Sequence, residues 1–135
     1  MNGQSPVFEN PASVAPPIGA YSHVARVPGG SELIVLAGQV GIMPDGTVPE
    51  GVEEQYAQAL RNIVALLASQ GASPTDLVKV NAYVVKPMDL TKVRETRARI
   101  IGDARPPSTL VYVSALAAPQ YLVEVEAWAV KPAAR

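Results

Sequence analysis

Apolar side chains recur with two different periods along the chain, and the change of period separates strands from helices. From Val52 onward they recur every three or four residues, which places them on one face of a helix. The positions that define this face are Val52, Tyr56, Leu60, Ile63 and Leu67. Gly71 stands where a left-handed C-terminal cap falls, so the pattern predicts a long helix that ends just before it.

A second helix is predicted after Asp89, whose side chain suits an N-cap. Apolar positions and one arginine, Arg97, follow at helical spacing up to Ile100, and Gly102 ends the helix. Between the two helices, Ser73 caps a short turn with Pro74 at its first position. The alternating residues 77–85 then predict a strand: Val78, Val80, Ala82 and Val84 share one face, and Lys79, Asn81 and Tyr83 share the other.

Four further β-rich segments complete the pattern. Residues 23–27 and 32–41 flank the turn-forming "PGGS" at 28–31, so we expect them to form a hairpin. Residues 108–114 and 121–130 are predicted as the last two strands, and residues 1–20 are expected to run over the surface. The element order β-β-α-β-α-β-β favours a single α+β domain over residues 1–135, with both helices packed on one face of the sheet. The other face is largely apolar, which indicates a partner subunit.

Composition removes several classes of function. The 135 residues carry a net charge of −1 with scattered Lys and Arg, so no basic footprint for nucleic acid is present. The sequence has no cysteine and a single histidine, His23, and no ligand spacing supports a metal site. It shows neither a signal peptide nor an apolar run long enough to span a membrane. We therefore expect a soluble, cytoplasmic protein that contacts neither membrane nor nucleic acid.

Two carboxylates in the last predicted strand are the candidates for chemistry. Glu124 and Glu126 are two residues apart, so a strand places them on the same face, roughly 6–7 Å apart. Such a pair suits acid–base work, and Trp128 on the same face adds apolar surroundings that favour proton transfer. The alternative interpretation is a solvated strand face of alternating polarity.

Four segments carry a resemblance to a known family. They read "PPIGAYSHVARV", "LAGQVG", "QYAQALRNIVALLASQGASPTDLVKVNAYV" and "RPPSTLVYVSALAAPQYLVEVEAWAV". In this order and spacing the chain resembles the RidA/YjgF family of small trimeric proteins. The resemblance implies a chorismate-mutase-like fold, a homotrimer whose three sheets form a central barrel, and a small metabolite bound in the cleft between subunits. It also implies hydrolysis of reactive imines and enamines to a 2-keto acid and ammonia, without metal or organic cofactor.

The family's site residues carry over unevenly. The resemblance implies that Glu124 holds the attacking water, that Tyr21 shapes the cleft, and that Gly38 offers its backbone, although Ala37 stands where the family has a serine. Thr109 corresponds to a small polar position of the cleft. Pro107, however, stands at the position of the family's arginine, which clamps the substrate carboxylate.

The loss of this arginine leaves the role of Arg105 and the function open. Arg105 lies two residues upstream of the clamp position, behind two stiff prolines. We expect it to be a surface or interface ion-pair residue, with a replacement clamp as the alternative. The resulting hypotheses are an imine or enamine hydrolase with altered or weak activity on 2-imino acids, a non-catalytic trimer that binds a metabolite, and an RNA-cleaving protein. The missing nucleic-acid footprint argues against the third.

Overall fold

A mixed sheet of five strands forms the body of the molecule. The computed structural model describes residues 5–133. The strands are β3 (Glu32–Val35), β4 (Gln39–Val40), β5 (Leu77–Val84), β6 (Ser108–Tyr112) and β7 (Val123–Lys131). They lie in the order β3-β7-β5-β6, with β4 also pairing with β7. Only β5 and β6 run parallel to each other. The strand order places β3 and β6 at opposite edges of the sheet.

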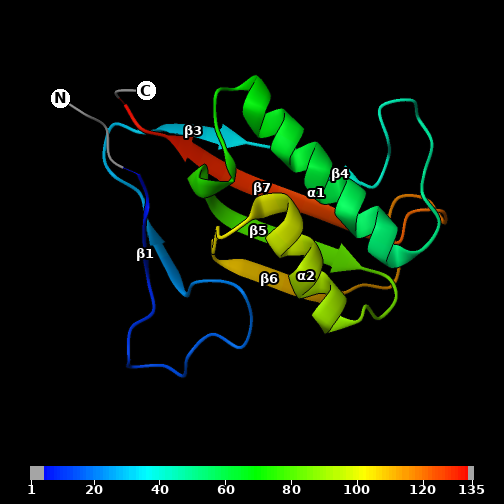
Figure 1. Cartoon of the computed structure of the whole chain (residues 1–135), viewed down its shortest axis with the longest axis horizontal. Helices are drawn as coiled ribbons and strands as arrows, with labels where there is room; N and C mark the ends of the chain where they lie inside the picture. The colour runs from blue at the N-terminus through cyan, green and yellow to red at the C-terminus, as the bar shows by residue number, and fades with distance from the viewer. Residues whose placement is uncertain (1–4, 134–135) are drawn as a thin grey trace.

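Both helices cover the same face of this sheet. α1 (Val52–Ser69) lies over β7, and α2 (Leu90–Ile101) lies beside α1 (Figure 1). The core between them is formed by the predicted apolar face of α1 and by alternate residues of the central strands. The largest fully buried side chains of this core are Tyr56, Leu60, Ile63, Leu67, Leu77, Val84, Val123 and Val125. The predicted α+β fold with two helices on one face is confirmed.

The predicted helix ends are also confirmed. The Asp89 carboxylate accepts hydrogen bonds from the backbone N–H of Thr91 at 2.9 Å and of Lys92 at 3.4 Å. Gly71 and Gly102 adopt φ angles of 72° and 64°, which side chains with a Cβ rarely tolerate. The short turn after α1 is a 3-10 helix, η1 (Pro74–Asp76), capped by Ser73.

The alternation predicted for β5 is right except at its start. A β-bulge lies between Leu77 and Lys79, where the register against β7 shifts. Leu77 pairs with Ala129 and takes the core position that we had predicted for Val78. The extra residue of the bulge explains the error, because a bulge interrupts the two-residue period.

The predicted hairpin between residues 23–27 and 32–41 is wrong. The turn at 28–31 does form, with the Ser31 N–H donating to the carbonyl of Pro28 at 3.4 Å. The two segments do not pair across it. Residues 24–26 form β2 (Val24–Arg26), which pairs with β1 (Val7–Glu9), a strand within the segment expected to run over the surface. The segment 32–41 divides into β3 and β4, and both pair with β7.

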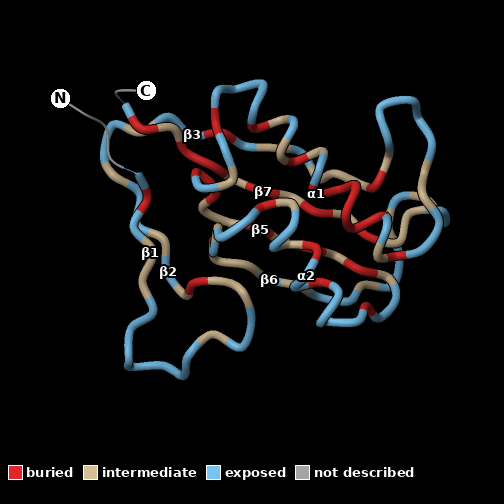
Figure 2. Tube along the Cα trace, in the orientation of Figure 1, coloured by how far each residue is buried: buried red, intermediate tan, exposed pale blue. Residues whose placement is uncertain are grey.

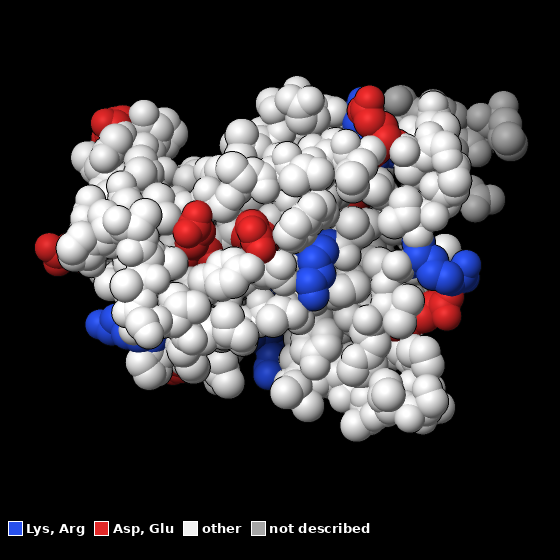
Figure 3. Space-filling view, turned by 180° about the vertical axis from the view of Figure 1, so that it is seen from behind, with Lys and Arg blue, Asp and Glu red and all other residues white. Residues whose placement is uncertain are grey.

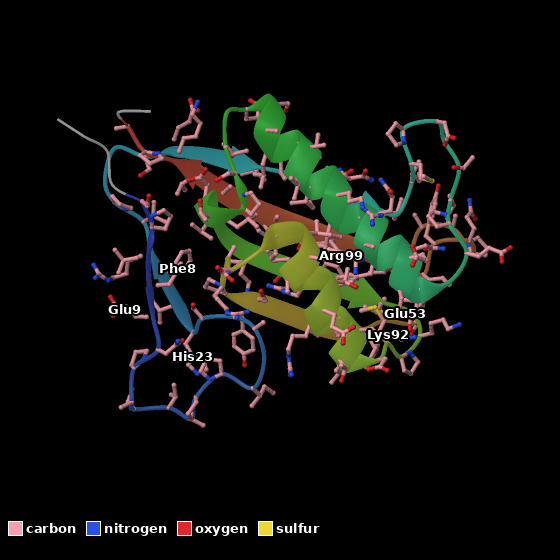
Figure 4. All side chains as sticks on the ribbon, viewed as in Figure 1. Phe8, Glu9, His23, Glu53, Lys92 and Arg99 are labelled. Atoms are coloured by element: carbon pink, nitrogen blue, oxygen red, sulfur yellow. The ribbon has the colours of Figure 1, made fainter. Side chains whose placement is uncertain are left out.

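Residues 5–27 thus form a separate unit, here called the arm, which stands beside the sheet (Figures 1 and 2). Within the arm, the Arg26 guanidinium lies 2.7 Å from the Glu9 carboxylate. The His23 ring bonds the carbonyl of Ala15 at 2.7 Å, so the single histidine holds the arm together (Figure 4). Turn chemistry in the sequence predicted the bend correctly, but it carries no information about which strand edge β2 meets.

Within residues 5–133, no helix has the length and apolar character needed to cross a bilayer.

Candidate functional site

The sheet face turned away from the helices carries the predicted chemistry. This face, here called the open face, bears Lys79, Asn81, Tyr83, Thr109, Glu124, Glu126 and Trp128. Figure 3 shows it as mostly uncharged, with few acidic and basic side chains. The prediction that Glu124 and Glu126 share one face is confirmed, because their neighbours Val123, Val125 and Ala127 are all in the core.

The two glutamates have different surroundings. Glu126 accepts hydrogen bonds from the Tyr83 hydroxyl at 2.6 Å and from the Asn81 amide at 3.1 Å. The hydrogen bond to this carboxylate raises the pKa of Tyr83, with smaller contributions from burial and from the charges of Glu126 and Glu124. The Glu126 carboxylate is therefore engaged in hydrogen bonds with its neighbours on the sheet.

Glu124 instead lies against the backbone at the start of β4. It stands opposite Val40 and Tyr83 in the sheet register. A Cβ added to Gly38 would overlap the Glu124 carboxyl group, so the close approach requires glycine at this position. The structure thus brings Gly38 and Glu124 together, and the Glu124 carboxylate faces the main chain of Gly38.

Gln55 holds the segment that leads into β7, and sequence reasoning missed it. Its side-chain amide donates to the carbonyls of Pro49 and Gln120, both at 3.1 Å, and its carbonyl oxygen accepts the Leu122 N–H at 2.8 Å. These bonds fix the chain two residues before Glu124. The sequence could have indicated this role, because Gln55 is a polar residue three positions after Val52, on the face of α1 that otherwise packs in the core.

Tyr21 and Thr109 line a cavity at the other edge of the sheet. This cavity of about 490 Å³, here called the arm cavity, lies between residues 18–21 of the arm, helix α2 and strand β6. Two guanidinium groups from α2, Arg94 and Arg97, also line it. Arg97 donates to the Ser108 hydroxyl at 3.1 Å and to the carbonyl of Ala20 at 3.4 Å, so it ties the arm to both α2 and β6.

The sequence analysis predicted only that Arg97 lies on the apolar face of the second helix. An arginine on that face could have indicated a further role, because a charged side chain among apolar ones needs polar partners. Burial raises the pKa of the Tyr56 phenol, and the Arg97 guanidinium acts in the opposite direction on that pKa. The Arg97 guanidinium therefore borders both the arm cavity and the buried phenol of Tyr56.

Arg105 lies in a neighbouring hollow. It is exposed and lines a cavity of about 500 Å³ together with Tyr21 and Arg94. Within residues 5–133 the only ion pair is that of Arg26 with Glu9, so Arg105 forms no ion pair with these residues. Pro107 serves the sheet, since its carbonyl accepts the Val80 N–H at 3.0 Å.

The predicted site residues therefore form two groups in one chain. Gly38 and Glu124 lie together at β4 and β7, whereas Tyr21, Thr109 and Arg105 lie around the arm and β6. Thr109, whose hydroxyl accepts a hydrogen bond from Lys79 at 3.1 Å, is two strands and two residues away from Glu124. That separation is on the order of 10 Å. Among the described residues, no group of three or more metal-ligating side chains is present.

Comparison with known proteins identifies the family. The family model described as Endoribonuclease L-PSP matches residues 12–131. This chain belongs to the RidA/YjgF family. A RutC family protein from Pyrococcus abyssi is 37% identical over 117 residues, which cover 85% of this chain and 89% of that protein. The mouse protein named 2-iminobutanoate/2-iminopropanoate deaminase is 32% identical over 116 residues, which cover 84% of this chain and 83% of the mouse protein.

A solved structure shows the same fold. The Rid family protein YyfB of Yersinia pestis, described as of unknown function, matches this RidA-family chain with a TM-score of 0.82 at 26% identity. The match covers 93% of this chain and 98% of the other, so it extends into the arm. The resemblance inferred from the sequence motifs is thereby confirmed for family and fold.

Proposed function

We propose that this RidA-family chain hydrolyses reactive imines or enamines in a cleft completed by a second copy of the chain. The observation that carries the proposal is the placement of Glu124 over the Gly38 backbone, while its neighbour Glu126 is held by Tyr83 and Asn81. A relative that is 32% identical over 116 residues is named 2-iminobutanoate/2-iminopropanoate deaminase. A carboxylate that accepts a proton from the attacking water assists hydrolysis of an imine, and Glu124 suits this role.

The separation of the site residues supports a homotrimer. In one chain Tyr21 and Thr109 lie at the β6 edge and Glu124 lies two strands away, so a single cleft that uses all three needs two subunits. The open face and the free edge of β3 also expose apolar side chains: Leu33 and Val35 are 61% and 59% exposed. Exposed apolar surface next to a sheet edge favours contact with another subunit. A trimer that is closed around these surfaces satisfies both observations.

The reaction needs few groups. Glu124 accepts a proton from a water molecule as the water oxygen attacks the imine carbon, and it returns this proton to the nitrogen as the C=N bond becomes a single bond. The resulting carbinolamine then loses its nitrogen: the C–N bond breaks, the nitrogen takes the hydroxyl proton and leaves as ammonia, and the oxygen remains as the carbonyl of the keto product. Tyr21 and the Gly38 main chain border the cleft and orient the substrate.

Recognition of a substrate carboxylate is the part that differs from the family pattern. Proline at position 107 has no charged group, so the contact that a guanidinium makes there is lost, a contact worth roughly 1.5–3 kcal/mol. We therefore expect kcat/KM for 2-imino acids to be at least about 10-fold below that of arginine-bearing relatives. Pro107→Arg recovers part of this deficit if the rest of the cleft is intact.

The substitution at Pro107 also favours a second candidate, a non-catalytic trimer that binds a small metabolite in the same cleft. The two functions differ in turnover. Imino acids generated freshly in the assay are incubated with the protein, and release of ammonia or keto acid above the spontaneous rate is followed.

Glu124→Gln is the decisive variant in this assay, with Glu126→Gln as its matched control. Loss of the general base predicts a decrease of about 10²-fold or more for the first. The second changes turnover much less, because Glu126 is engaged with its sheet neighbours. Equal effects of the two substitutions contradict the role of Glu124, and the absence of any turnover by the wild-type protein leaves metabolite binding as the function.

A further inference from the structure

The arm contains a strand with a free edge, and the sheet has a free edge that nothing in residues 5–133 covers. β2 pairs only with β1, and β3 pairs only with β7. A two-stranded ribbon is marginally stable by itself in water. An open edge with exposed apolar side chains accepts further strands readily.

Within one chain the two edges are kept apart. Arg97 bonds the carbonyl of Ala20 and thereby holds the arm at α2 and β6. β3 is at the opposite edge of the sheet, because the strand order is β3-β7-β5-β6. Three strand spacings amount to roughly 14 Å. The arm therefore cannot remain docked on β6 and pair with β3 of its own chain.

We propose that β2 of one copy pairs antiparallel with β3 of the next copy, so that the arms exchange strands around the trimer. The occupant of the β3 edge is a second copy of this chain, and the inference extends the proposed function by naming the contact that builds its shared cleft. The proposal satisfies both free edges at once. It leaves the Arg97 contact in place, because the partner's β3 comes to the docked arm.

The register follows from the turn at residues 28–31. Antiparallel pairing around a four-residue turn places Val27 opposite Glu32, and Val24 then lies opposite Val35. Exchange reproduces these pairs between chains. It covers two valines that are 36% and 59% exposed in the single chain. It also places Ala25 opposite Ile34, which points into the core.

The same register has a consequence for the site. Toward the N-terminus, the same pairing brings Tyr21 toward residues 36–38 of the partner subunit, which join β3 to β4 and include the glycine that lies against Glu124. Tyr21 also lines the arm cavity with Thr109 of its own chain. The two groups of site residues that one chain keeps apart thus meet at Tyr21.

The chain has no cysteine, so disulfide crosslinking reports on the exchange without background. Full-length Val24→Cys and Val35→Cys single variants are unfolded together, refolded and oxidised. The strand exchange predicts a covalent dimer on a non-reducing denaturing gel, because directly opposed positions satisfy disulfide geometry. A hairpin closed within each chain produces no such dimer, since each chain then carries one cysteine.

Two controls and a second variant make the outcome unambiguous. Each single variant alone reports non-specific crosslinking. In a mixture of Val27→Cys with Val35→Cys, the two cysteines are three residues out of register, about 10 Å apart along the strand, so this mixture is the second control. The double variant Val24→Cys/Val35→Cys forms a covalent trimer if strands are exchanged. An intramolecular disulfide, or thiols that stay free, overturns the proposal. Arg26→Cys with Leu33→Cys probes the same register if the first pair fails to assemble.

Failure of this inference is distinguishable from failure of the proposed function. If the double variant closes within one chain while Glu124→Gln still abolishes imine hydrolysis, the exchange is wrong and the hydrolase assignment stands. If the covalent trimer forms and the wild-type protein shows no turnover, the exchange stands and the hydrolase assignment is wrong.

Discussion

Replacing Gly38 by alanine tests whether the placement of Glu124 matters for hydrolysis. The backbone of Gly38 has an ordinary conformation, since its φ is not among the positive values in the chain, so alanine adds no backbone strain. The new methyl carbon would lie 2.8 Å from Cδ of Glu124 and 3.0 Å from its Cγ. To reach a van der Waals separation of about 3.5 Å, the carboxyl group must move by at least about 0.7 Å.

A displacement of this size has a large effect on catalysis and a small one on stability. Misplacement of a reacting group by about 1 Å costs on the order of 10²-fold in rate, so we expect kcat/KM of Gly38→Ala to fall by about 10- to 100-fold. The far end of the Glu124 side chain can rotate away, so the melting temperature stays within a few degrees of the wild type. Gly29→Ala is the matched control, because a methyl group there meets nothing within 4 Å.

The assay is steady-state ammonia release from freshly generated imino acid, with both substitutions also made in the Glu124→Gln background. If Gly38→Ala acts through the carboxylate, its effect largely disappears in that background, which is the signature of coupled residues. Full activity of Gly38→Ala, or an equal loss in both backgrounds, refutes the reasoning that Gly38 serves to place Glu124.

Three further predictions concern other parts of the molecule. Arg105→Ala is expected to change kcat/KM for 2-imino acids by less than about threefold, because the side chain is exposed. Abolished activity in a variant that folds and assembles as the wild type does would make Arg105 the carboxylate clamp. Gly41→Ala is expected to lower the free energy of unfolding by roughly 1–3 kcal/mol in a denaturant titration, since its Cβ would lie 2.7 Å from the backbone Cα of Gln55, which cannot move aside; an unchanged midpoint contradicts this contact. Glu126→Gln is expected to lower the pKa of Tyr83 toward its ordinary value of 10.0, because the Glu126 carboxylate accepts a hydrogen bond from the phenol and repels the phenolate. An NMR titration of the tyrosine ring carbons measures this pKa, and an unchanged value would exclude the carboxylate as the cause.

Local patterns in the sequence determined most of the secondary structure. The three- and four-residue spacing after Val52 defines α1, and the capping residues Asp89 and Gly102 define the ends of α2. Two-residue alternation correctly placed Glu124 and Glu126 on one face of β7. These features depend on residues a few positions apart, whose relative directions are set by helix and strand geometry alone.

Strand partners and side-chain pairing were decided by the tertiary structure. Whether β2 meets β3 or β1 depends on contacts across the chain, and the turn at 28–31 is compatible with either partner. Likewise, equal spacing made Glu124 and Glu126 indistinguishable until Tyr83 and Asn81 were seen to bond only Glu126. The pairing of Gly38 with Glu124 and the docking of Arg97 on Ala20 join residues that are far apart in sequence. Such contacts are selected by packing of the whole sheet and its helices, and no local period encodes them.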